Sequence, residues 1–157
     1  YKTNDNTYTI PELDTSFKTY MDYRTITDKS SMQWEIQQNA WTDSDGFRRI
    51  NDDYIVAVGS YYAEECGERF RIVFDDDDEI TITIGDLKQN RHTDKTNRYT
   101  AVYNEYGEFV SANVLEFIVD TQKLSKRSKL LGSVNNHDYL NGNIKIIERI
   151  ETKEYER

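Results

Sequence analysis

The chain has 157 residues, which suffices for one domain with a substantial core, and its formal net charge is −9. An acidic surface repels phosphate backbones and anionic lipid, so nucleic acid is not expected as a partner, whereas a neutral glycan is compatible with this charge. Cys66 is the single cysteine, which excludes an intramolecular disulfide and a cysteine-based zinc site.

The N-terminal part of the chain is polar and contains the only proline. This predicts a tail or linker over residues 1–15 and a single β-barrel domain over residues 16–157. The chain begins at Tyr1 rather than Met, which indicates a processed or trimmed form; removal of a signal peptide or membrane anchor is one explanation. No apolar run approaches the ~20 residues needed to span a bilayer, so no membrane span is expected. Residues 17–47 indicate short strands, with a helical turn near residues 31–38.

Clear strand patterns begin at Tyr54, where "YIVAVGSYY" is typical of a buried strand that runs into a polar loop. The segments "RFRIVF" and "EITITI" then alternate apolar and polar residues. The "DDDD" between them, residues 75–78, is expected to be a solvated hairpin turn rather than a Ca²⁺ site. Residues 98–112 predict a second hairpin around "NEYG".

The last third of the chain combines an apolar strand, a helix and a closing strand. "VLEFIVD" ends at Asp120, and the basic segment 121–132 predicts a short helix that stops at Gly132. "NIKIIERI" then supplies the final strand. Short strands at regular spacing indicate a small, mainly β barrel.

Several of these motifs form a pattern: a "CGERFRIVF" strand, strands that end in aspartate, and a helix followed by a closing strand. The pattern resembles the double-psi β-barrel of the rare lipoprotein A, 3D-domain and membrane-bound lytic transglycosylase A families and of expansins. The chain is also similar to uncharacterised proteins of Gram-positive bacteria through its "YMDYR", "HTD" and "EFIVD" stretches. The residues that match the barrel pattern are Gly67, Phe70, Ile72, Asp86, Val119, Asp120, Leu124, Leu131, Gly142, Ile144 and Ile146.

The resemblance implies a six-stranded double-psi β-barrel with one or two short helices and an N-terminal extension. It further implies a secreted or cell-surface bacterial protein that cleaves peptidoglycan or another polysaccharide, in the manner of a lytic transglycosylase, with no cofactor or metal. The sequence "GDLKQN" stands where rare lipoprotein A has an Asn-Asp-Arg-Gly pattern. That difference favours an alternative, a non-catalytic cell-surface module that binds glycan or protein, including a component of a phage or conjugative element.

Glycan cleavage requires a proton donor for the leaving oxygen, usually a carboxylic acid. In the resembling families an aspartate on this barrel acts as the general acid/base, which makes Asp120 the first catalytic candidate. Asp86, at the end of "ITITIGD", is the second carboxylate that a hydrolytic enzyme would need. Each has a structural alternative: Asp120 as the N-cap of the following helix, and Asp86 as a turn former.

His92 and Asp94 are candidates for binding substrate, either as a hydrogen-bonded pair or as separate loop residues. A metal site would need further ligands, such as His137 and Asp138 from a second loop. Ser60 and Tyr61 follow the buried strand that starts at Tyr54, so they are further candidates for contacts with a sugar. The abundance of tyrosine also has a structural explanation, because tyrosine favours half-buried sheet surfaces.

Overall fold

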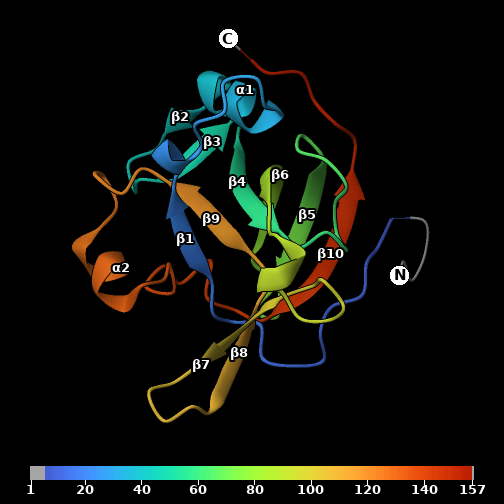
Figure 1. The fold of residues 1–157 in the computed structure, drawn as a ribbon, viewed down its shortest axis with the longest axis vertical. Helices are drawn as coiled ribbons and strands as arrows, with labels where there is room; N and C mark the ends of the chain where they lie inside the picture. The colour runs from blue at the N-terminus through green and yellow to red at the C-terminus, as the bar shows by residue number, and fades with distance from the viewer. Residues whose placement is uncertain (1–5, 157) are drawn as a thin grey trace.

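A computed structural model describes residues 6–156 and shows a mainly β fold with two short α-helices. A hairpin and two 3₁₀ turns complete the structure (Figure 1). The elements are β1 (Thr19–Asp22), η1 (Tyr23–Thr25), α1 (Met32–Asn39), β2 (Trp41–Thr42), β3 (Arg48–Ile50), β4 (Asp53–Val58), β5 (Arg69–Phe74), β6 (Glu79–Leu87), η2 (Asn90–His92), β7 (Thr100–Tyr103), β8 (Phe109–Asn113), β9 (Glu116–Val119), α2 (Lys126–Leu131) and β10 (Ile144–Ile150).

Eight strands form one mixed sheet whose main path runs β1-β9-β4-β6-β5-β10, with β2 and β3 attached beside β4. The pairs β1–β9 and β4–β6 are parallel, and the other pairs along the path are antiparallel. Figure 1 shows the path curving from the blue β1 to the red β10, with the β7–β8 hairpin projecting at one end. The prediction of a mainly β chain with short helices is therefore confirmed.

The sheet is open rather than a closed barrel, since no ladder among the described residues joins β1 to β10. A buried lysine links the two edges instead. Lys18, just before β1, donates from Nζ to the carbonyl oxygens of Ser16 at 2.8 Å and of Gly142, just before β10, at 2.6 Å. The expected closure by a sixth strand pair is thus replaced by a side-chain contact at one end of the sheet.

Local sequence signals place most elements correctly. The predicted helical turn near residues 31–38 is α1, and Ser31 caps it by accepting from the Trp34 amide at 3.1 Å. Asp75–Asp78 form the turn of the β5–β6 hairpin, and "NEYG" forms the turn between β7 and β8. The stop at Gly132 is also confirmed, because this residue has the left-handed conformation of a C-cap, with φ of 66°.

The predicted helix over residues 121–132 is shorter than expected. α2 begins at Lys126, and its N-cap is Ser125, whose hydroxyl accepts from the Ser128 amide at 3.1 Å. The segment before it is a turn in which the carbonyl oxygen of Asp120 accepts from the amides of Lys123 and Leu124. Ser125, directly before Lys126, thus defines the start of α2, and Asp120 is not its N-cap.

Residues 6–15, where a tail or linker is predicted, lie against the sheet. The Tyr8 amide donates to the carbonyl oxygen of Ile147 in β10 at 3.0 Å, and the Arg149 amide donates to that of Asn6 at 2.8 Å. Pro11 and Thr15 are buried. This segment extends the edge of β10 by backbone pairing; residues 1–5 of the predicted tail lie outside the described part of the chain.

Candidate active site

A row of four paired residues crosses the middle of the sheet. Thr19 in β1 pairs with Glu116 in β9, Glu116 pairs with Ala57 in β4, and Ala57 pairs with Asp86 in β6. Directly paired residues direct their side chains to the same face of a sheet. Glu116 and Asp86 therefore project from one face, separated by the small side chain of Ala57.

A β-bulge at Gly85 decides which face Asp86 occupies. Val56 pairs with Ile84, but the next residue of β4, Ala57, pairs with Asp86, so Gly85 is an extra residue in β6. A strict alternation would put Asp86 on the same face as the buried Ile84; the bulge turns it to the opposite face. A side chain at position 85 would collide with Ile55 and would lie 2.9 Å from Cδ1 of Ile118, so glycine is required.

The row opens into a cavity of about 470 Å³, which we name the Asp86 cavity. This volume is typical of small-ligand sites. Its lining mixes polar and apolar surface and comes from β1, β6, the segment that follows β6, η2, the hairpin and β9. The lining residues are Thr19, Asp86, Leu87, Lys88, Gln89, His92, Thr100, Val102, Asn113 and Glu116.

Hydrogen bonds fix the side chains at one wall of the Asp86 cavity. The Thr19 hydroxyl donates to Oε2 of Glu116 at 2.9 Å and lies 2.8 Å from the side-chain amide of Asn113. Lys88 donates from Nζ to the carbonyl oxygen of Asn113 at 2.9 Å. Glu116 is thus held in one position, as expected for a group that acts on a bound ligand.

Burial lowers the pKa of Lys88 to about 8, and the nearby Glu116 carboxylate partly opposes this shift. An ammonium group in a poorly solvated position is less favourable than in water, so the proton is released more easily. The lysine therefore carries its charge at neutral pH and loses it in mildly alkaline solution. Its charge and the charge of Glu116 face the same cavity.

Asp86 also borders a second cavity, of about 280 Å³, on its other side. Met21 of β1 and Gln33 of α1 line this space together with Asp86 and residues 25–28. Thr19 and Met21 are two residues apart on β1, so one strand contributes to both cavities. Asp86 is the residue that lines both cavities.

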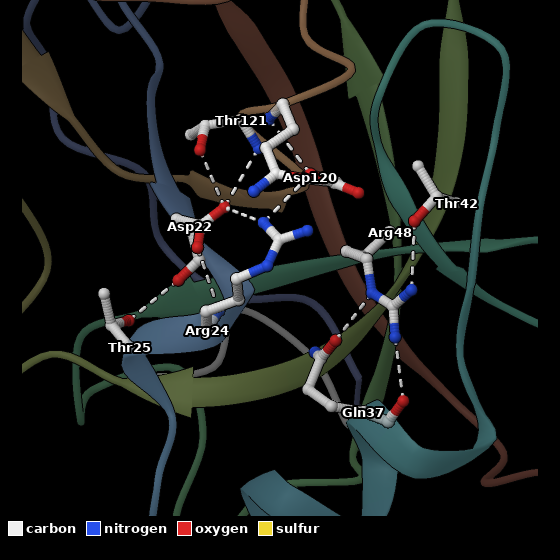
Figure 2. A network of polar contacts seen from close by, with 9 residues as sticks. Asp22, Arg24, Thr25, Gln37, Thr42, Arg48, Asp120 and Thr121 are labelled. Carbon is white, nitrogen blue, oxygen red and sulfur yellow. Dashed lines mark hydrogen bonds and ion pairs between the residues drawn. The ribbon is translucent and has the colours of Figure 1, made fainter.

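Asp120 lies in a different environment, a group of ion pairs that we name the Asp120 network: Asp22, Arg24, Asp120 and Thr121 (Figure 2). Nη1 of Arg24 donates to Asp120 at 3.0 Å and to Asp22 at 3.1 Å. The amide and hydroxyl of Thr121 both donate to Asp22 at 2.9 Å. Figure 2 shows the Arg24 guanidinium between the two carboxylates. The network joins η1 to the turn after β9.

The contacts of Asp120 favour its ionised form. Burial by itself raises the pKa of this carboxyl, but hydrogen bonds from Arg24 and from the Gln122 amide, at 3.0 Å each, outweigh burial and lower the pKa. A proton donor needs the opposite shift. Asp120 is 5% exposed and lines neither cavity beside Asp86. These contacts support a positioning role for Asp120; a catalytic role for it stays a prediction.

His92 and Asp94 occupy different positions in the η2 loop. His92 lines the Asp86 cavity. The Asp94 carboxylate instead accepts from the backbone amides of Thr96 at 3.0 Å, Arg98 at 2.9 Å and Tyr99 at 3.1 Å. These bonds shape the loop, and with the Thr96 hydroxyl they outweigh the effect of burial and lower the pKa of Asp94. The structure thus places His92 in the lining of the Asp86 cavity, whereas Asp94 organises the backbone of the loop.

Ser60 and Tyr61 are also structural partners of loops. The Ser60 hydroxyl donates to Oδ1 of Asn90 at 2.7 Å and so connects the end of β4 to η2. The hydroxyl of Tyr61 lies 2.7 Å from Oγ1 of Thr9 in the N-terminal segment. Neither residue lines the Asp86 cavity, so their predicted contact with substrate would have to lie outside it.

No group of three or more histidine, cysteine, aspartate or glutamate residues within the described residues 6–156 has the arrangement of a metal site. His137, the possible partner of His92, packs with its ring centroid 5.2 Å from that of Phe47 and 5.6 Å from that of Tyr139. His92 and His137 thus lie in different environments, one in the lining of the Asp86 cavity and the other among aromatic rings.

Eight of the ten residues that line the Asp86 cavity escaped the sequence interpretation, among them Thr19, Lys88 and Glu116. Glu116 is the single charge inside the apolar run "VLEFIV", which is a usable signal. Lys88 follows Asp86 by two residues, but its burial depends on the hairpin. Thr19 has no distinctive local pattern. Its role arises only from pairing with a strand 97 residues away.

A scan of protein-family models finds none that matches this chain, and searches of curated proteins and of solved structures find no match either. Over residues 6–156, no helix is long and apolar enough to cross a membrane. The geometry of the Asp86 cavity is therefore the main support for a function.

Proposed function

We propose that this protein is a bacterial cell-wall enzyme that cleaves glycan strands in the Asp86 cavity. The observation that carries the proposal is the pair of carboxylates, Asp86 and Glu116, which face one cavity from either side of Ala57. Two strand spacings put their Cα atoms roughly 10 Å apart. Carboxyl groups about 6.5–9.5 Å apart are typical of inverting glycosidases, in which water enters between acid and base.

The roles of the two carboxylates follow from their contacts. Glu116 accepts from Thr19 and lies near the Lys88 ammonium, so we assign it the anionic role of activating water or stabilising positive charge on the sugar. Asp86 then protonates the leaving oxygen. In a lytic transglycosylase mechanism, a hydroxyl of the sugar replaces water and a single carboxylate suffices. In both mechanisms the reaction depends on Asp86.

The fold and location complete the proposal. Two parallel strand pairs within a six-strand path, together with the sequence resemblance, support an opened form of the double-psi β-barrel. A glycan-cleaving member of that group would be secreted or held at the bacterial cell surface, where peptidoglycan is its polymeric partner. The acidic composition suits a polymer that is bound mainly through hydroxyl and amide groups.

A second candidate function is a glycan-binding module without catalysis, including one from a phage or conjugative element. The β7–β8 hairpin favours it, because Tyr103, Tyr106 and Phe109 are 61%, 78% and 41% exposed. Thr100 and Val102 of the same hairpin line the Asp86 cavity. Exposed aromatic rings beside a polar cavity are suited to stacking on sugars.

Digestion of purified sacculi separates the two functions. The wild-type protein should release soluble muropeptides, whose ends, anhydro or hydrated, distinguish the two mechanisms by mass spectrometry. Glu116→Gln should reduce release by about 10²–10⁴-fold if water is the nucleophile, whereas the exposed control Glu105→Gln should have no effect. Binding to sacculi without release of fragments would support the binding module. Absence of both binding and cleavage would contradict both functions.

A further inference from the structure

A separate cavity of about 330 Å³ lies between η1, α1 and the segment that joins them, and we name it the Trp34 cavity. Its walls include Tyr23, Arg24, Ile26, Lys29, Trp34 and Gln37. Most of the surface that lines it is apolar. It shares no residue with the Asp86 cavity, although Ile26 and Thr27 also line the second cavity beside Asp86.

One buried polar group in the wall of this cavity has no hydrogen-bond partner among the described residues. Gln37 is 5% exposed, and its Nε2 forms no hydrogen bond with the described part of the chain. The orientation of the amide is fixed by Arg48, whose Nε donates to Oε1 of Gln37 at 2.9 Å. Because a guanidinium group only donates, the atom that faces it must be the oxygen. Figure 2 shows the amide nitrogen on the side away from Arg48.

An unsatisfied donor in such a place is costly, because the amide has lost water without gaining an acceptor. Arg48 also holds the backbone of Gln37, donating from Nη2 to its carbonyl oxygen at 2.8 Å. Two hydrogen bonds from Arg48 thus hold Gln37 in place, and the N–H groups of its buried Nε2 are left without an acceptor in the wall of the cavity. A ligand oxygen that accepts from Nε2 would remove the penalty.

The walls of the Trp34 cavity carry positive charge in an acidic protein. Arg24 and Lys29 line it, and no carboxylate of the described residues does. Arg24 is already paired with Asp22 and Asp120. Among residues 6–156, no carboxylate forms an ion pair with Lys29, whose Nζ lies 5.8 Å from the ring centroid of Trp34. Lys29 is thus available to an anion.

We propose that the Trp34 cavity is a binding site for a small carboxylate attached to an aromatic or other flat apolar group. The apolar group packs against Trp34 and Tyr23, one carboxylate oxygen accepts from Nε2 of Gln37, and Lys29 supplies the opposite charge at the open side. A neutral amide of the same shape keeps the packing but loses the ion pair, and an amine is repelled by Lys29. The site thus selects for negative charge.

Trp34 provides the measurement. The chain has two tryptophans, so Trp41→Phe leaves Trp34 as the only indole. In this background, fluorescence is titrated with phenylacetate, phenylacetamide and phenethylamine at constant ionic strength. Phenylacetate should give a saturable change, the amide should bind at least about tenfold more weakly, and the amine should show no saturable change.

Two variants and a control connect the signal to the proposed contacts. Gln37→Glu keeps an oxygen for Arg48 but replaces the free N–H donor with a second oxygen, so phenylacetate affinity should fall by at least about tenfold. Lys29→Gln changes an exposed side chain that does not endanger folding, and affinity should fall about fivefold. Lys95→Gln, on a distant exposed loop, should leave affinity unchanged.

The proposal is overturned if phenylacetate gives no saturable change, since the cavity then holds solvent only. It is equally overturned if the three probes bind alike, or if both the Gln37 and Lys29 variants bind phenylacetate as tightly as the parent. Selective binding of the amine would contradict the assigned charge. None of these outcomes depends on whether the protein cleaves glycan.

Discussion

Asp86 lies one residue before the end of β6 and Asp120 directly follows β9; both strands flank β4, yet the surroundings of the two aspartates differ. Asp120 is 5% exposed and accepts from the Arg24 guanidinium and the Gln122 amide. Within the described residues, Asp86 accepts a single hydrogen bond, from the Leu87 amide at 2.9 Å, and it borders two cavities. The Asp120 carboxylate is therefore used in hydrogen bonds within the protein, whereas the Asp86 carboxylate is available to a ligand.

The comparison shows that a strand-end aspartate acquires its role from residues far away in the sequence. Arg24, which neutralises Asp120, lies 96 residues before it. For Asp86 the decisive feature is the bulge at Gly85, which moves the side chain away from the buried isoleucine face. The same residue type thus becomes a structural anchor at one strand end and a candidate reactive group at the other.

The rate of cleavage should distinguish the two aspartates most strongly. Asp86→Asn should lower muropeptide release by about 10²–10⁴-fold, because the amide cannot transfer the proton. Asp120→Asn should lower it by less than about tenfold, since Asp120 acts through Arg24 and the position of η1. Both are measured as initial rates on sacculi, with the exposed Asp138→Asn as control. Equal losses of activity at both aspartates would indicate that Asp120 takes part in the reaction as well.

For stability the order of the two aspartates is reversed, and substitution of Asp120 should have the larger effect. Asp120→Ala should lower the free energy of unfolding by ~1–3 kcal/mol, since charge-assisted hydrogen bonds at a buried site are lost. Asp86→Ala should change it by less than ~0.5 kcal/mol. Urea denaturation at pH 7 measures both values.

The pH dependence of the Asp120 effect provides a control. The folded-state pKa of Asp120 is lowered, so its contribution is present above the unfolded value of about 3.9 and is lost as the pH falls through the folded value. The difference between wild type and Asp120→Ala should therefore shrink below about pH 4. A difference that persists unchanged at lower pH would indicate lost packing rather than lost charge.

Local patterns predicted the elements of the fold, because alternation, hairpin turns and the signals at Ser31 and Gly132 act over a few residues. One local signal was missed, the Ser125 cap that starts α2. Local patterns also could not predict the open sheet, because it depends on β1 and β10, which lie near opposite ends of the chain and form no ladder with each other. A glycine inside a strand often marks a bulge. The bulge at Gly85, which moves Asp86 to the other face of the sheet, was therefore the missed feature that the sequence could most easily have predicted.

The same limit applies to the candidate site. The sequence offers His92 as a candidate for binding substrate, and in the structure it lines one cavity with Asp86. Glu116 joins them only through the register of β9 with β4, which a single sequence does not reveal. Asp94 resembles a ligand by spacing, yet its carboxylate is used by the backbone of its own loop.

A smaller effect concerns the charge opposite Glu116 in the Asp86 cavity. Burial lowers the pKa of Lys88 to about 8, so the ammonium is present at pH 7 and about tenfold depleted at pH 9. If this charge orients Glu116 or the substrate, cleavage should decline about tenfold over that interval. Lys88→Met should be less active at pH 7 and should lose the alkaline decline. If the activity of Lys88→Met declined with the same midpoint pH, the alkaline decline would belong to a group other than Lys88.

The smallest expected effect concerns the hairpin at the edge of the Asp86 cavity. Tyr106 is 78% exposed at the hairpin turn, where a ring can stack on a sugar that extends from the cavity. Tyr106→Ala should weaken binding to sacculi about threefold, as expected for one solvent-exposed stacking contact. Leu130→Ala is the matched control, since Leu130 is 87% exposed on α2. A pelleting assay with the inactive Asp86→Asn background measures binding without cleavage. Equal binding by both variants would remove the hairpin from the site, and the polar residues around Asp86 would then account for recognition alone.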